Sequence, residues 1–261
     1  MAASPNQKTG FHPFRPNPII TQLDEHLCRS RASEGASTSS SLGGKLNSLQ
    51  DLQDCVNKLL LLPLNQQAIA QENTSKLIDE LLDGSLQVLD LCNTAKDALL
   101  QTKESIHEFQ SILRRRCCGE TGNANEVKKY LTSRKVVIKK TCTFSTFNGV
   151  HETTSTFNKL KEIVVVSLKV FESLLSFISR PKAKTTVAPA DEEADINEFA
   201  KADAALSALV DQNTRKSDNI KGVQTQLQNL ELFAQDIEGG LEHLSRNLIK
   251  TRVSFLNILH H

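Results

Sequence analysis

The sequence predicts an all-α protein: a multi-helix bundle of long amphipathic helices with a flexible N-terminal arm. The composition favours helix over sheet, because Leu, Lys, Glu, Gln and Ala are frequent and there is one Tyr and no Trp. The clearest helical period runs through residues 82–113, where apolar side chains recur mostly every three or four residues and so lie on one stripe of a helix. That predicted stripe consists of Leu82, Leu86, Leu89, Cys92, Ala95, Leu99, Ile106, Phe109 and Leu113.

The chain of 261 residues is long enough for one domain with a substantial core. We assign residues 1–44 to the flexible arm, since this part is rich in proline near its start and in Ser and Gly over 33–44. The arm also contains a short predicted helix over 19–31. Residues 45–261 form the bundle domain, with an internal linker at about 181–195 that contains proline and an acidic cluster.

The first half of the bundle domain begins with a helix that starts at Leu46. Pro63 ends or kinks this helix at the preceding residue, because proline lacks the backbone N–H and disfavours helix just before it. A brief helix through 66–70 follows, and the long helix then starts near residue 73 or 74. Gly84 lies inside its apolar pattern, which indicates either a local bend or a close crossing with another helix.

The second half begins after a break at 119–125. Its first helix has an apolar stripe made of Val127, Tyr130, Leu131, Val137, Ile138 and Phe144. The next helix covers residues 160–178, because the spacing and length of its apolar positions outweigh the β-branched run at 163–166.

Three further helices are expected over 195–213, 216–238 and 240–259, with Gly239-Gly240 as a C-cap and turn between the last two. The last helix is apolar around much of its circumference, so we expect burial on more than one side and a C-terminus at the centre of the bundle. Its predicted buried face is Leu241, Leu244, Leu248, Phe255 and Ile258, broadened by Ile249, Val253 and Leu256.

Residues that could carry chemistry are scattered. The seven histidines have no metal-binding spacing, and no nucleophile or phosphate-loop motif is present. Cys55 and Cys92 fall on helical faces as small buried hydrophobes. Cys117-Cys118 lies beside an arginine run that favours thiolate, so it is either a redox pair or an ordinary exposed helix end. We expect no catalytic residue, no metal and no cofactor.

The strongest local charge feature is a basic segment over residues 114–140, in which nine basic residues, Arg134 among them, face only Glu120 and Glu126. Such a segment attracts phosphates, acidic lipid headgroups or an acidic protein. The alternative is a solvated helical face, partly neutralised by acids such as those near 191–198. Because no aromatic residues are interleaved, sequence-specific nucleic acid binding is not expected. The candidate binding patch is Arg114, Arg115, Arg116, Lys128, Lys129, Lys135, Lys139 and Lys140.

The most apolar window, residues 163–178, contains Lys169 and Glu172 and has only 16 residues, whereas a membrane span needs about 20 largely uncharged ones. We therefore expect no transmembrane segment. No hydrophobic signal peptide is visible, which favours a cytoplasmic protein. The lack of acids before Asp24 keeps plastid import as an alternative.

Several segments resemble a plant-specific family of helical proteins called BYPASS-like. The resemblance covers residues 46–261 in order and is carried by LQDLQDCV at 49–56, LPLNQQA at 62–68, LDGSLQVLDLC at 82–92, LRRR at 113–116, YLTSRK at 130–135, FESLLSF at 171–177 and LIKTRVSFLNIL at 248–259. It implies a role linked to root and shoot development, no established enzyme activity and no site residues.

These observations favour a non-enzymatic intracellular regulatory or adaptor protein that binds a protein partner through helix surfaces. The alternative is a peripheral binder of anionic membranes or phosphate ligands through the basic segment. An enzyme with a site hidden among the helices is the third hypothesis.

Overall fold

The computed structural model describes residues 17–32, 39–71, 75–115, 123–141, 155–179, 197–211 and 217–259. Regular structure in these residues is entirely helical, so the all-α prediction is confirmed. The helices are α1 Pro18–Ala32, α2 Ser39–Leu60, α3 Pro63–Gln71, α4 Ser75–Arg115, α5 Asn123–Thr141, α6 Ser155–Ser179, α7 Glu198–Asp211 and α8 Ser217–Leu259.

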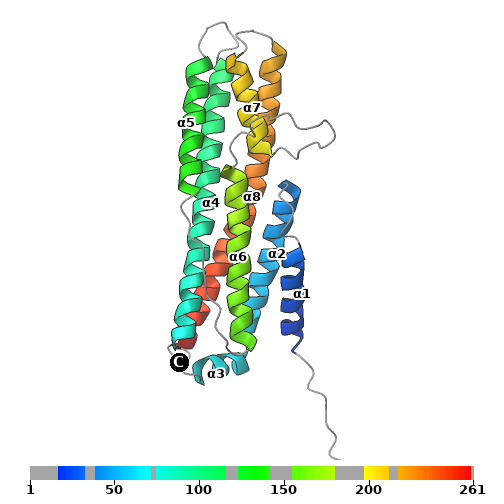
Figure 1. The fold of residues 1–261 in the computed structure, drawn as a ribbon, viewed down its shortest axis with the longest axis vertical. Coiled ribbons are helices and arrows are strands. Elements are labelled where there is room, and N and C mark those ends of the chain that lie inside the picture. The colour runs from blue at the N-terminus through cyan, green and yellow to red at the C-terminus, as the bar shows by residue number, and fades with distance from the viewer. Residues whose placement is uncertain are drawn as a thin grey trace, which may run out of the picture.

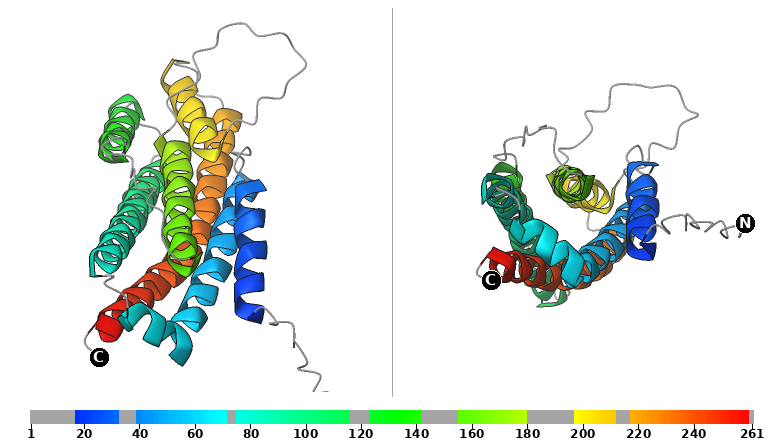
Figure 2. Two further views of the ribbon diagram at one scale, coloured as in Figure 1. Left: turned by 60° about the horizontal axis from the view of Figure 1, so that its bottom comes forward. Right: turned by 90° about the horizontal axis from the view of Figure 1, so that it is seen from below.

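Two long antiparallel helices, α4 and α8, run most of the length of a rod-shaped bundle (Figure 1). They have 41 and 43 residues, which corresponds to about 60 Å each. In one half of the rod, α2 and α6 pack with them and α1 lies outside α2. In the other half, α5 packs on α4 while α7 packs on α8 (Figure 2). The short helix α3 lies at one end, against α2 and α8.

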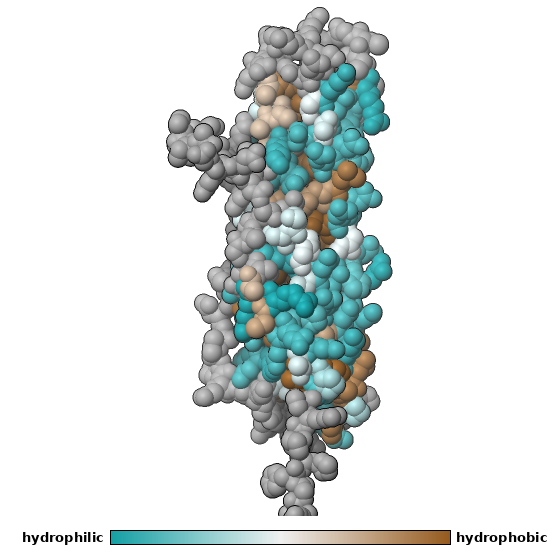
Figure 3. All heavy atoms as spheres, turned by 90° about the vertical axis from the view of Figure 1, so that its right-hand side faces the viewer, coloured by the Kyte–Doolittle hydropathy of each residue, from teal (hydrophilic) through white to brown (hydrophobic). Residues whose placement is uncertain are grey.

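Aliphatic side chains from every helix form one continuous core along the rod. Leucine dominates it, and Phe171 and Phe199 are its largest fully buried side chains. The surface on the side of α1 and α2 is mainly hydrophilic with small apolar patches (Figure 3). The predicted helices over 19–31 and 160–178 correspond to α1 and α6, and Pro63 begins α3 after α2 has ended at Leu60.

The boundary of the predicted flexible tract is wrong. Residues 39–44 form the first turns of α2 rather than a flexible segment, because Leu42 is fully buried and anchors them in the core. The helix α1 also joins this core through Leu23 and Leu27. The expected arm over 1–16, the rest of the Ser/Gly tract at 33–38 and the linker at 181–195 lie outside the described residues, as do Cys117, Cys118 and Phe144.

Two glycine predictions have different outcomes. Gly84 marks a close helix crossing, since a Cβ there would lie 2.8 Å from Val164 Cγ1 of α6. The turn predicted at Gly239-Gly240 is wrong, because α8 continues through both residues. The carbonyl oxygen of Gly240 accepts a 3.1 Å hydrogen bond from Gln50 Nε2 of α2. Packing against α2 therefore overrides the low helix propensity of the glycine pair.

The predicted face of the last helix is only partly correct. The five residues of its main stripe are buried. Ile249, Val253 and Leu256 are exposed. The prediction that these three residues broaden the buried face of the helix is therefore wrong. The helix α8 contacts α2, α4, α7 and α3, and these three positions lie on the side of α8 that the contacts leave exposed. Leu86 of the predicted α4 stripe is also exposed.

Candidate functional site

The outer face of α5 collects the lysines of the predicted patch that the structure describes. This helix packs against α4, α6 and α7 and lies at the edge of the rod (Figure 1). The described side chains that it exposes are Asn125, Lys128, Lys129, Thr132, Lys135 and Val136, and none of these is acidic. Spacings of three and four residues place them on one side of the helix.

One of these lysines is neutralised by α4. The ammonium group of Lys129 forms an ion pair with Glu108 in which both side chains are more than half exposed. Such exposed pairs contribute about 0–1 kcal/mol to stability. Lys128 and Lys135 have no ion pair within the described part of the chain, and they carry the remaining positive charge of the face.

Arg114 lies apart from this face. It lines a groove of about 320 Å³ between the end of α4 and the start of α8, together with Gln110, Gln224, Gln228 and Glu231. A cation in the last turn of a helix is also stabilised by the helix dipole. The structure therefore separates Arg114 from the α5 lysines. The side chains of Arg115, Lys139 and Lys140 are not described, and Arg116 lies outside the described residues.

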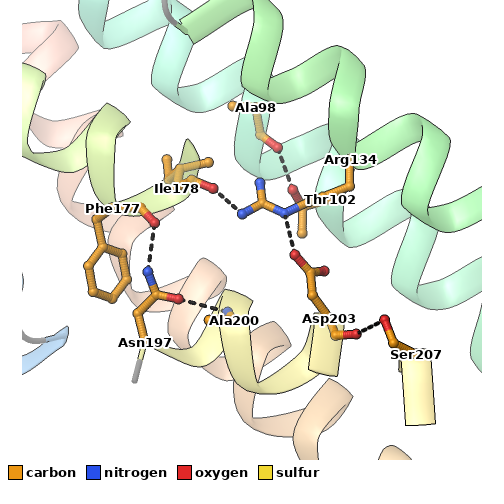
Figure 4. Close-up of polar contacts among 9 residues, drawn as sticks. All are labelled: Ala98, Thr102, Arg134, Phe177, Ile178, Asn197, Ala200, Asp203 and Ser207. Carbon is orange, nitrogen blue, oxygen red and sulfur yellow. Dashed lines mark hydrogen bonds and ion pairs between the residues drawn. The ribbon is translucent and has the colours of Figure 1, made fainter. Parts of the chain in front are cut away.

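Arg134 belongs to the interior rather than to the basic surface, because its side chain is only 4% exposed. Its guanidinium donates a hydrogen bond to the carbonyl oxygen of Ile178 at the end of α6 (Figure 4). Its Nε lies 3.6 Å from Asp203 Oδ2 of α7, and its Cζ lies 4.3 Å from the ring centroid of Phe199. The side chain thus connects α5 with both α6 and α7.

Asn197 completes this interhelical connection from the start of α7. Its Oδ1 accepts a 2.7 Å hydrogen bond from the backbone N–H of Ala200, which is an N-cap of α7. Its Nδ2 donates a 2.9 Å hydrogen bond to the carbonyl oxygen of Phe177. Two carbonyl groups in the last turn of α6 are therefore satisfied by side chains from α5 and α7, as Figure 4 shows.

The buried charges have shifted pKa values. Burial lowers the pKa of Arg134, while Asp203 and Tyr130 act in the opposite direction. Burial is also the largest cause that raises the pKa of Tyr130, and the neighbouring Asp203 raises it further. Asp203 therefore offsets part of the cost of burying the charged guanidinium of Arg134 in an apolar environment.

Two cysteines are buried in the described core. Burial raises the pKa of the Cys92 thiol to about 11 and also raises that of Cys55, which makes both weak nucleophiles at neutral pH. The prediction that these two cysteines are buried is confirmed. The described residues contain no group of three or more His, Cys, Asp or Glu side chains that could hold a metal ion.

The fold and the α5 face define a rod-shaped helical bundle with a basic outer helix. The chain belongs to the family described as Protein BPS1, whose sequence model matches residues 45–258. This confirms the family resemblance and indicates a plant regulatory protein. Comparison with curated proteins and with solved structures found no match. Within the described ranges, every helix is too short or too polar to cross a membrane.

The sequence contains a signal for the buried arginine. Arg134 follows Val127 and Tyr130 at spacings of seven and four residues, so it lies on the apolar stripe of α5. Its partner Asp203 is 69 positions further along the chain, and no local pattern links the two.

Proposed function

We propose that this protein is a non-enzymatic adaptor in plant root and shoot development that binds an acidic protein partner through the outer face of α5. The observation that carries the proposal is the exposed pair Lys128 and Lys135, which have no ion pair in the described structure and no acidic residue among the described exposed side chains of α5. Val136, which is 46% exposed, adds an apolar contact to the same face. Charged rims with an apolar centre are typical of protein interfaces.

The non-enzymatic part of the proposal is supported by the chemistry of the described interior. The buried thiols have raised pKa values, and Arg134 and Asp203 face one another and neighbouring helices. The developmental part is supported by membership of the Protein BPS1 family.

Proximity labelling in plant tissue tests the adaptor function. The full chain is compared with the variant Lys128→Glu/Lys135→Glu. The control variant Lys201→Glu/Lys221→Glu reverses two exposed lysines on α7 and α8. We expect proteins that are labelled by the parent and the control to be lost with the α5 variant, and root and shoot growth of a loss-of-function plant to be rescued only by the first two. An unchanged set of labelled proteins would contradict the proposal.

Peripheral binding to anionic membranes is the second candidate, because Lys128 and Lys135 lie seven residues apart on one exposed side of a helix. Each lysine near an acidic surface contributes about 1 kcal/mol, so reversal of both should reduce binding by a factor of at least about 30. Flotation with phosphatidylserine-containing vesicles measures this, with neutral vesicles as the control. Absence of binding at low salt would exclude the membrane candidate and leave the adaptor function intact.

A further inference from the structure

The outer face of the antiparallel pair α4–α8 is a second surface, separate from the α5 face. Two contacts fix the register of the pair. Lys103 Nζ lies 2.5 Å from Glu238 Oε2, and Arg252 Nη1 donates a 2.7 Å hydrogen bond to the carbonyl oxygen of Leu82. Residues 82–90 of α4 are therefore level with the segment of α8 that contains residues 246–256.

Exposed apolar side chains gather where these two segments lie together. Leu86 of α4 is 41% exposed, and Ile249 and Val253 of α8 are each 49% exposed. Leu256, one turn further along α8, is 37% exposed. Helical periodicity places these residues on the solvent side of the groove between the helices, because the opposite stripes of α4 and α8 form the core. They make one apolar strip that no described helix covers.

The two edges of this strip carry opposite charges. On α4, Asp83, Asp90, Asp97 and Glu104 recur every seven residues on the exposed surface. None of the four forms an ion pair within the described ranges. On α8, Arg246 and Lys250 are exposed, and within the described ranges Arg246 forms its ion pair with Glu242 on its own helix. The α4 edge of the apolar strip is thus acidic, and the α8 edge is basic over residues 246–250.

We infer that this face binds a second copy of the chain in a two-fold symmetric dimer whose axis is parallel to the helices. Such an axis places α4 of one copy opposite α8 of the other, so that the segment of α4 around Asp90 faces the segment of α8 that carries Arg246 and Lys250. The register puts Asp90 at the level of Arg246 and Lys250, so these groups meet across the interface. A two-fold axis perpendicular to the helices within the interface would instead place the acidic edges opposite each other, which is unfavourable.

The size of the face is sufficient for a modest interface. The acidic stripe from Asp83 to Glu104 is about 33 Å long, and two helices side by side are about 20 Å wide. The resulting footprint of about 660 Å² per copy is slightly below the roughly 800 Å² per partner of a standard interface. An interface of this size is typical of weak, reversible association, and its formation does not depend on the function proposed for α5.

Sedimentation of the full chain over a range of concentrations tests the dimer. The parent should show a monomer–dimer equilibrium. The variants Asp90→Lys and Lys250→Asp should each weaken self-association at least about tenfold. Glu172→Lys and Lys221→Asp, which make the same charge changes on exposed parts of α6 and α8, serve as controls and should dimerise like the parent.

Mixing the two interface variants provides the decisive test, because the proposed dimer is symmetric. When Asp90→Lys chains are mixed with Lys250→Asp chains, both charge pairs of the interface are restored in the heterodimer. The mixture should therefore associate about as well as the parent, although each variant alone does not. A parent that stays monomeric throughout the micromolar range, variants that dimerise like the controls, or a mixture without recovery would each overturn the inference.

Discussion

Replacement of Arg134 by methionine tests whether the buried charge pair holds α5, α6 and α7 together. Methionine retains much of the aliphatic volume but removes the hydrogen bond to Ile178 and the positive charge beside Asp203. Asp203 is only 8% exposed, so its carboxylate would remain buried without the arginine. Removing one partner of a buried ion pair costs about 3–5 kcal/mol.

This cost is large in relation to the whole protein, because the free energy of unfolding of a typical protein is about 5–15 kcal/mol. For a chain of this size, the melting temperature should fall by about 6–20 °C. Urea unfolding followed by circular dichroism measures the free energy, and Lys135→Met is the control because Lys135 is the exposed neighbour in sequence. We expect the control to remain within about 0.5 kcal/mol of the parent.

A double variant separates the charge from the packing. Arg134→Met/Asp203→Leu removes both charges, and replacing a whole buried ion pair by apolar residues is often neutral or stabilising. The double variant should therefore be more stable than Arg134→Met alone, although the carbonyl group of Ile178 still lacks its donor. If Arg134→Met unfolds like the parent, or if the double variant is no more stable than the single one, the proposed role of the charge pair is refuted.

Three further predictions concern the core. Leu248→Asp should lower the free energy of unfolding by several kcal/mol because it buries a lone carboxylate, whereas Ile249→Asp at the exposed neighbour should lower it by less than about 0.5 kcal/mol. Equal losses of stability in thermal unfolding at low protein concentration would refute the assigned face of α8. Gly84→Ala should lower the free energy of unfolding by about 1–2 kcal/mol, since overpacking against Val164 outweighs the gain in helix propensity. Adding Val164→Ala to the same chain should recover part of this free energy, as measured by urea unfolding. The thiol of Cys92 has a folded pKa of about 11 against an ordinary value of 9.0, so the stability that its protonated form contributes is complete below pH 9 and is lost as the pH rises to about 11. The variant Cys92→Ala should therefore show a shallower decline of the free energy of unfolding over this pH range, and a decline identical to that of the parent would contradict the prediction.

The sequence is a good guide to the helices because the apolar period reflects which side of each helix is buried. The main stripe through Leu244 of α8 is correct, and the stripe through Leu99 of α4 is correct apart from Leu86, since burial on one side selects a spacing of three and four residues. Errors arise where an apolar residue lies on a second side of a helix. Periodicity cannot distinguish a core position such as Leu248 from an exposed one such as Ile249, because the difference depends on where the neighbouring helices lie.

The candidate site is less predictable than the fold for a related reason. Counting charges between residues 114 and 140 treats all basic residues alike, yet the structure buries Arg134, pairs Lys129 with Glu108 and separates Arg114 from the α5 face. Each of these outcomes depends on a residue or helix distant in the sequence. The same holds for Gly240, whose helical conformation is supported by a hydrogen bond from Gln50, 190 positions earlier.

The buried polar cluster and the exposed lysine face are two sides of the same helix. Val127 and Tyr130 are buried on α5, and Arg134 continues their stripe as a polar contact. The contacts of Arg134 with Ile178 of α6 and Asp203 of α7 add to this burial and so contribute to the position of α5. Since Lys128 and Lys135 are exposed on α5 while Val127, Tyr130 and Arg134 are buried on its other side, the buried contacts of these three residues orient the proposed binding face.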